Sequence, residues 1–268
     1  MKQLRTLPSF KPFESSPELV RVLDAIRFGP LDDRDEHAEF TWFIREYPRA
    51  YRHHLDHAEH RLKSILAEYE REHSVALQRI RNRALDDEWY EMAISTRGKR
   101  RPPPQAIYWD FESYLNAISS ALDIAARVAG TAYRQETPPN FNRFCKKAPG
   151  GAVKEIFVRA QRRWVKRLKA YRDCFSHYTP VDTLLFLVLR EYNDEWQLRA
   201  KLPVNPNIRD ILAFRYSKRV ELLAYSTSVW RHLRAFDRAL AREIRRMYQA
   251  GEYPQRTTNL FFVGQRSE

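Results

Sequence analysis

Three residues near the end of one predicted helix have the types and spacing of an acid–base site. Arg172, Asp173 and His177 stand in the stretch YRDCFSHYTP, which ends at Pro180. Residues 173 and 177 are i,i+4 neighbours on a helix, so the carboxylate can reach the imidazole and fix its tautomer. The last turn of a helix also favours a cation, because the helix dipole is negative there. His177 is therefore a candidate general acid or base.

Arg172 needs a further condition to join this pair. It lies five residues before His177, which is about 140° round an ideal α-helix. The two side chains converge only if the long arginine reaches round, or if the helix distorts near its end. The alternative interpretation is a core helix with a solvated basic face and a histidine near its cap.

One helix over 152–179 has to position these residues. It follows Gly150-Gly151 and precedes Pro180, which are boundary signals. Apolar residues recur along it at three- or four-residue spacing and predict a buried stripe: Ile156 or Phe157, Ala160, Trp164, Leu168, Tyr171 and Phe175. A second row is basic and leads to Asp173: Arg159, Arg162, Lys166 and Lys169, with Arg163 and Arg167 flanking it.

The arrangement at 172–177 resembles the signature of a known superfamily. Arg172, a polar residue directly after it and His177 are similar to the Arg-polar-x-x-x-His motif of the higher eukaryote and prokaryote nucleotide-binding (HEPN) superfamily. As in that family, the motif stands in the C-terminal part of a helix that follows an earlier amphipathic helix. The resemblance covers roughly residues 104–250. It implies an all-α domain that is usually dimeric and often works as a metal-independent ribonuclease.

The resemblance also implies roles for individual residues. His177 would be the general acid or base for attack of a ribose 2′-hydroxyl on the adjacent phosphate. Arg172 would stabilise charge on the phosphoryl oxygens, and Asp173 would orient His177. The expected RNA and phosphate contacts are the basic row and a neighbouring tyrosine: Arg159, Arg162, Arg163, Lys166, Lys169 and Tyr178. No metal or other cofactor is expected.

Partners are implied by the same resemblance. Two copies of the motif usually meet across a dimer in the family, and this chain has one copy, so a homodimer is expected. Members that act as toxins or phage-defence effectors often pair with an operon-encoded nucleotidyltransferase antitoxin, which modifies a tyrosine two residues after the histidine. Here Tyr178 follows His177 immediately, which departs from that pattern. The other hypotheses are a non-catalytic HEPN-like helical scaffold and a basic nucleic-acid-binding protein.

Composition indicates a polyanionic partner. The 268 residues include 47 Lys and Arg against 34 Asp and Glu, for a formal charge of +13. Such an excess favours nucleic acid over membrane as the partner, because no apolar run approaches a transmembrane span. Residues 1–13 lack the apolar core of a signal peptide, and two cysteines without a CxxC pair predict neither a zinc site nor a disulfide framework. We expect a cytoplasmic protein.

The expected fold is all-α, a bundle of long helices with one small β-hairpin at about 183–202. The hairpin is predicted from turn residues at 192–194 and from apolar–polar alternation after them. Four parts are expected: an N-terminal arm with long helices over 1–97, a basic proline-rich loop over 98–105, a HEPN-like core over 106–251 and a tail over 252–268. Expected helices span 17–28, about 32–47 with a kink or restart at Pro48, 51–85, 106–129, 152–179 and 208–250, with a loop over 131–151.

Two rows of side chains have more than one interpretation. His53, His57 and His60 share a helix face, which fits either a metal site or an exposed polar surface. The face points away from the apolar stripe of the same helix, which favours the polar surface. A row on the last helix needs a compensating partner, either phosphate or acidic residues of the 32–91 region: Arg231, Arg234, Arg238, Arg242 and Arg245.

Overall fold

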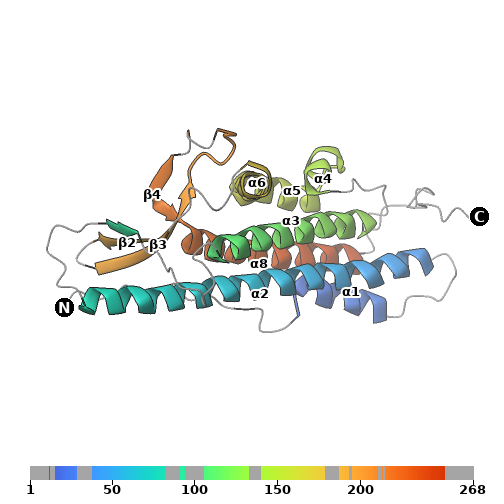
Figure 1. Ribbon diagram of the computed structural model, residues 1–268. Coiled ribbons are helices and arrows are strands. Elements are labelled where there is room, and N and C mark those ends of the chain that lie inside the picture. Colours follow the sequence, from blue (N-terminus) through green and yellow to red (C-terminus); the bar gives the residue numbers. More distant parts are fainter. Residues whose placement is uncertain are drawn as a thin grey trace, which may run out of the picture. The chain divides into compact units, whose positions relative to one another are not determined.

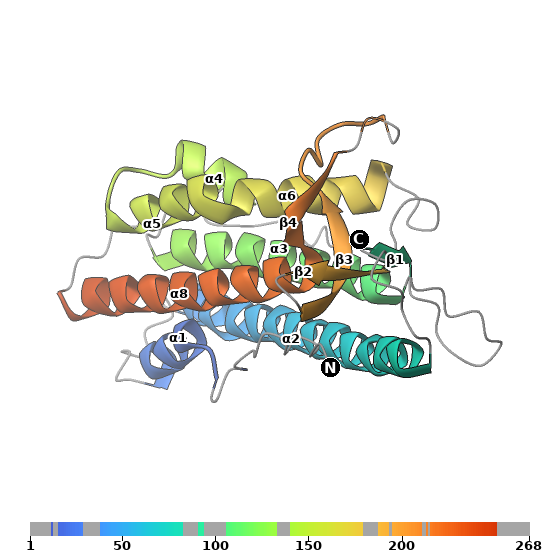
Figure 2. The same cartoon turned by 90° about the vertical axis from the view of Figure 1, so that its left-hand side faces the viewer.

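The structure, a computed structural model, describes residues 12, 16–28, 38–82, 91–93, 106–132, 140–178, 187–192, 195–210, 213 and 215–250. These residues form two compact units, each built from three stretches of the chain. Unit 1 lies within residues 1–12, 57–116 and 167–230, and unit 2 lies within residues 13–56, 117–166 and 231–268. The division falls inside long helices, so each unit holds parts of the same helices (Figures 1 and 2).

Unit 2 is helical and has a phenylalanine core. Its helices are α1 (Glu18–Phe28), α4 (Phe141–Lys147), α5 (Ala152–Ala160) and parts of α2 (Ala38–Asn82), α3 (Ala106–Ala132) and α8 (Leu222–Gln249). The ring of Phe157 lies 4.9 Å from that of Phe141, 4.3 Å from that of Phe144 and 5.1 Å from that of Phe236. These rings join α5 to α4 and to α8. Helix α1 lies beside the N-terminal part of α2 (Figures 1 and 2).

Unit 1 contains the remaining parts of α2, α3 and α8, together with α6 (Lys166–Asp173) and a small sheet. Phe111 of α3 is fully buried at the centre of an aromatic cluster. Its ring lies 6.4 Å from Tyr171, 5.3 Å from Phe175 and 6.2 Å from Tyr225. The hydroxyl of Tyr171 also donates a hydrogen bond to the carbonyl of Pro203 at 2.6 Å, which attaches α6 to the sheet.

The sheet confirms the predicted hairpin and extends it. Strands β2 (Leu187–Tyr192) and β3 (Glu195–Pro203) pair antiparallel, with Leu187 opposite Ala200. Strand β1 (Glu91–Ala93) pairs with β2, and β4 (Tyr216–Glu221) pairs with β3, so the strand order is β1-β2-β3-β4. The expected all-α bundle with one small hairpin is therefore confirmed, and the two outer strands add to it.

Tyr69 of α2 ties the sheet to the helices. Its hydroxyl accepts a hydrogen bond from the N–H of Ala200 at 3.0 Å and donates one to the carboxylate of Glu221 at 2.9 Å. Glu221 also accepts from the backbone N–H groups of Leu223, at 3.2 Å, and Ala224. Glu221 is therefore the last residue of β4, and its carboxylate both caps α8 and binds Tyr69 of α2.

Two predicted boundaries were wrong. The last helix begins at Leu222 and not near residue 208, because residues 216–221 pair with β3 and Glu221 supplies the helix cap. Residues 131–151, predicted as a loop, contain helix α4. The side chain of Asn140 accepts a hydrogen bond from the N–H of Arg143 at 3.0 Å, and this cap begins α4.

The predicted helix over 152–179 is confirmed from Ala152 to Tyr178, but it is not α-helical throughout. Helix α5 passes into the π-helical segment η2 (Gln161–Val165), then into α6, and ends in a second π-helical segment, η3 (Cys174–Tyr178). In η2 the N–H of Lys166 donates to the carbonyl of Gln161, a bond across five residues. Each π-helical segment makes a wider turn than the α-helix around it.

Some predicted features lie outside the described residues: most of the N-terminal arm, the basic loop over 98–105 and the tail over 252–268. Among the helices that the structure describes, none has an apolar stretch long enough to span a membrane.

Candidate active site

The turn that carries His177 is anchored on α3 within unit 1. Phe175 stacks on the ring of Tyr108, with 6.2 Å between ring centroids and 17° between planes. One residue further, the hydroxyl of Ser176 donates a hydrogen bond to a carboxylate oxygen of Glu112 at 3.0 Å. An apolar contact and a polar contact therefore hold η3 on α3, and His177 follows them directly in the chain.

Arg172 and Asp173 form an ion pair just before this turn. The Nε of Arg172 lies 3.0 Å from Oδ1 of Asp173, and the side chains are 32% and 42% exposed. The Nε is buried and the contact does not have hydrogen-bond geometry. The pair is partly solvated, so its contribution to stability is about 1 kcal/mol at most. The described residues offer the guanidinium no other ion pair.

The π-helical winding of η3 changes the relation between Arg172 and His177. In an α-helix two residues five positions apart point about 140° away from each other. Bonding from i to i+5 makes a wider turn, so residues five positions apart come closer to one side of the helix. Helix distortion was one of the two conditions under which Arg172 and His177 were expected to converge, and single π-turns are frequent at functional sites. The imidazole of His177 is exposed, and its predicted contact with Asp173 stays a prediction.

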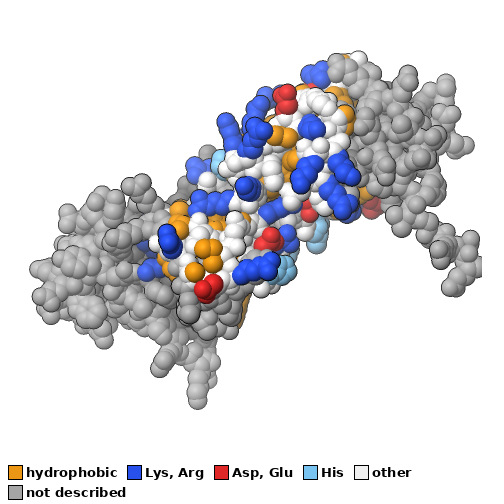
Figure 3. Space-filling view, turned by 90° about the horizontal axis from the view of Figure 1, so that it is seen from above, with side chains coloured by type: hydrophobic (Ala, Val, Ile, Leu, Met, Phe, Trp, Pro, Cys, Tyr) orange, Lys and Arg blue, Asp and Glu red, His pale blue; other side chains and the backbone are white. Residues whose placement is uncertain are grey.

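The predicted phosphate contacts are divided between the units. Arg159, Arg162, Arg163 and Lys166 belong to unit 2 and are exposed. None of these four forms an ion pair with a described residue. Lys169 belongs to unit 1 and is half-buried, and the side chain of Tyr178 lies outside the described residues. Lys and Arg side chains gather over α4 and α5, with few acidic side chains among them (Figure 3).

Arg167, which flanks the basic row, makes a structural contact. Its guanidinium carbon lies 5.5 Å from the ring centroid of Tyr171 and 5.9 Å from that of Tyr225. Its Nη2 donates to the hydroxyl of Tyr171 at 3.2 Å. Burial raises the pKa of Tyr171, and the charge of Arg167 offsets part of that shift. Arg167 therefore stabilises the packing of α6 against α8 by a cation–π contact.

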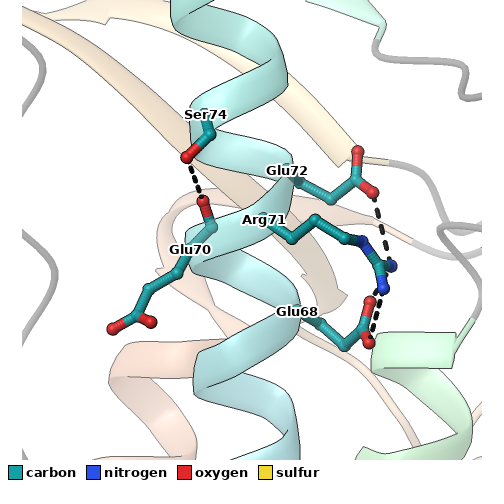
Figure 4. Close-up of polar contacts among 5 residues, drawn as sticks. All are labelled: Glu68, Glu70, Arg71, Glu72 and Ser74. Carbon is teal, nitrogen blue, oxygen red and sulfur yellow. Dashed lines mark hydrogen bonds and ion pairs between the residues drawn. The ribbon is translucent and has the colours of Figure 1, made fainter.

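Several described carboxylates of α2 pair with basic residues of the same helix. They pair within α2, in three ion pairs: Glu46 with Arg49, Asp56 with Arg52 and Glu59 with Lys63. Further along α2, Arg71 lies between Glu68 and Glu72, and its Nη2 is 3.5 Å from the buried carboxylate of Glu72 (Figure 4). Four arginines of α8 are exposed and have no ion-pair partner among the described residues: Arg231, Arg238, Arg242 and Arg245.

Three histidines of α2, His53, His54 and His57, contact other side chains. In unit 1, Nε2 of His57 accepts a hydrogen bond from Nε of Arg61 at 3.2 Å, and Arg61 in turn pairs with Asp110 at 3.0 Å. In unit 2, the rings of His53 and His54 meet edge to face at 5.4 Å. No three His, Cys, Asp or Glu side chains of the described part of the chain come together as a metal site.

Two contacts near the basic residues could not be recognised in the sequence. The bond between Ser176 and Glu112 joins residues 64 positions apart. The ring of Trp164, counted only as part of the buried stripe, stacks on His232 of α8. Residue spacing within a helix does not reveal such long-range pairs. A polar residue next to a candidate imidazole, as Ser176 is next to His177, is a reason to look for one.

No protein-family model, curated protein or solved structure matches this chain. The candidate site therefore rests on the sequence pattern and on the geometry described above.

Proposed function

We propose that the chain is a HEPN-like, metal-independent endoribonuclease in which His177 and Arg172 act on RNA. The observation that carries the proposal is the π-helical turn η3, which bears an exposed imidazole five residues after a partly exposed arginine. The excess of exposed basic side chains without ion-pair partners among the described residues supports a polyanionic substrate. The setting that we propose is a toxin or phage-defence role, with either an antitoxin or another operon-encoded protein as the partner.

The chemistry assigns one task to each residue. His177 accepts the proton of a ribose 2′-hydroxyl while the 2′ oxygen attacks the adjacent phosphorus. The P–O5′ bond breaks, the leaving 5′ oxygen takes up a proton, and the products carry a 2′,3′-cyclic phosphate and a 5′-hydroxyl. Arg172, whose Nε lies 3.0 Å from a carboxylate oxygen of Asp173, stabilises the negative charge that develops on a phosphoryl oxygen.

A second copy of the chain completes the site in this proposal. Proton transfer to the leaving oxygen needs an acid in addition to the base, and one chain supplies one histidine in the motif. A two-fold dimer that brings two copies of η3 together provides the second imidazole, and such dimers are the commonest assembly of soluble proteins. A monomer in sedimentation experiments at the concentration of the cleavage assay would contradict this part.

The deciding experiment is cleavage of a labelled RNA by the full chain, with EDTA present. His177→Ala and Arg172→Ala should each lower the rate by about 10²-fold or more, because a general acid–base group and a group that stabilises developing charge each contribute that much. His60→Ala removes an exposed histidine of α2 and is the matched control, with no change expected. Unfolding free energies should stay within about 1–2 kcal/mol. Cleavage that survives both substitutions, or that stops with EDTA, contradicts the proposal.

A further inference from the structure

Unit 2 contains a ring pair that the proposed reaction does not use. Trp164 of η2 and His232 of α8 stack with 6.1 Å between ring centroids and 14° between planes. The indole is 7% exposed, whereas the histidine is exposed. The tryptophan is therefore a buried support, and the imidazole ring lies over it at the surface of the unit.

An arginine from each helix acts on this imidazole. Burial lowers the pKa of His232, and the charges of Arg231 and Arg163 lower it further. Both guanidinium groups are therefore within electrostatic range of the ring, one from α8 and one from η2. Both are exposed, and neither has an ion-pair partner among the described residues.

The positive charge continues along both helices of unit 2. Arg159 and Arg162 precede the ring pair on α5 and η2, and Arg238 and Arg242 follow it on α8. All four are exposed. Like charges gathered in this way repel one another, and a bound polyanion removes that repulsion.

We infer that Arg163, Trp164, Arg231 and His232 form a binding surface for single-stranded nucleic acid, in which a base stacks on His232 and the flanking phosphates bind the arginines. Stacking on an aromatic side chain accepts every base, and arginines beside it follow the backbone. A duplex keeps its bases stacked inside and cannot use the ring. An acidic peptide would use the charges but not the aromatic surface. This surface does not depend on the ribonuclease proposal, because none of its four residues takes part in the proposed reaction.

The test is fluorescence anisotropy of a labelled, unstructured RNA of about 20 nucleotides, a length that spans one binding site. His177→Ala serves as the parent so that cleavage does not interfere. His232→Ala should weaken binding about tenfold, which corresponds to the loss of one stacked base. His232→Phe keeps a flat ring and should restore the affinity. A duplex of equal length should bind more weakly and should not respond to His232→Ala.

The arginines are tested by the salt dependence of binding. Arg163→Gln with Arg231→Gln should lower the slope of log K against log salt concentration by about 1.4, for two phosphate contacts on a single strand. Arg49→Gln with Arg52→Gln removes the same charge from ion-paired positions of α2 and should change the slope less. Equal slopes in the two double variants would overturn the inference. Binding of polyglutamate as tight as that of RNA would also overturn it.

The binding experiments test the surface even if a variant is less stable, and their outcome is separate from that of the cleavage experiments. If His232→Ala lowers the midpoint of thermal unfolding, the test is the salt dependence of the double variant Arg163→Gln and Arg231→Gln, because both arginines are exposed. Binding that follows the expected pattern in a chain without cleavage activity would leave this surface established and remove the ribonuclease. Cleavage that needs His177, with RNA binding unchanged in the arginine and His232 variants, would do the reverse.

Discussion

The carboxylate of Asp237 on α8 accepts a hydrogen bond from the backbone N–H of Glu18 at 2.8 Å, although the two residues lie 219 positions apart. Its other oxygen accepts from the N–H of Leu19 at 3.3 Å. The first N–H groups of a helix have no partner within the helix and carry the positive end of its dipole. Asp237 therefore caps α1 from another helix, from a buried position in unit 2.

Asp237 should make stability depend on pH. Burial raises its pKa to about 6, although the two N–H groups oppose the shift. Because the pKa is 3.8 in the unfolded chain, the folded state binds the proton more tightly. The stabilisation is full below that value and is lost as the pH rises through about 6, so the unfolding free energy falls by up to about 3 kcal/mol. Urea unfolding at pH 4, 5.5 and 7 measures it.

Asp237→Asn is the control for this prediction, since asparagine does not titrate there. The stability of the native chain relative to this variant should decrease from pH 4 to pH 7. A difference that stays constant, or that grows with pH, would show that the carboxyl of Asp237 does not titrate as proposed.

Arg172→Lys should lower RNA cleavage nearly as far as Arg172→Ala, by about 10²-fold. A lysine ammonium keeps the charge but cannot contact Asp173 through one nitrogen and a phosphate through two others. The rate of cleavage at saturating RNA measures the effect. Arg215→Lys, at an exposed arginine of unit 1, is the matched control. An active lysine variant would reduce the role of Arg172 to that of a point charge.

Removing the bond between Ser176 and Glu112 should lower kcat and leave KM nearly unchanged, because these residues only position η3. A double-mutant cycle of Ser176→Ala and Glu112→Ala should give a coupling free energy of about 0.5–1.5 kcal/mol. Ser74→Ala removes an exposed hydroxyl that bonds to a carbonyl of its own helix and should change neither quantity (Figure 4). A change in KM alone would assign Ser176 to RNA binding.

Phe157→Ala should lower the unfolding free energy by about 3–5 kcal/mol, because it opens a cavity among three phenylalanine rings of unit 2. Phe157→Leu retains most of the volume and should cost less than about 1.5 kcal/mol. Chemical unfolding measures both. A cost below about 1 kcal/mol for the alanine variant would mean that α4 is not held by this cluster.

The sequence was sufficient for the long helices and for the turn-bounded hairpin, because these depend on local periodicity and on prolines, but it was not sufficient for the short helix α4. The sequence was not sufficient for β4, which ends at the cap of α8 and was predicted as part of that helix. Only its pairing with β3 identifies it as a strand. The sequence predicted Arg172, Asp173 and His177 as a group and named helix distortion as a condition for it. The π-helical segments themselves depend on tertiary packing, and a helical pattern of apolar residues does not reveal them.

Tyr69→Phe should lower the unfolding free energy by about 1–3 kcal/mol, because two buried polar groups lose a partner. The N–H of Ala200 loses its acceptor, and the carboxylate of Glu221 loses a donor. Burial already raises the pKa of Glu221, and the Tyr69 hydroxyl opposes that shift. The pKa should therefore rise further in the variant, and a titration followed by NMR detects this. An unchanged pKa would exclude the bond.

The same hydroxyl has a consequence for the way the sheet opens. A hairpin held only by its own ladder can exchange its amide protons through a small local fluctuation. Here the release of Ala200 from Tyr69 also frees Glu221, whose carboxylate holds the first turn of α8. The amide protons of β3 and those at the start of α8 should therefore exchange with solvent together, as one cooperative unit of opening.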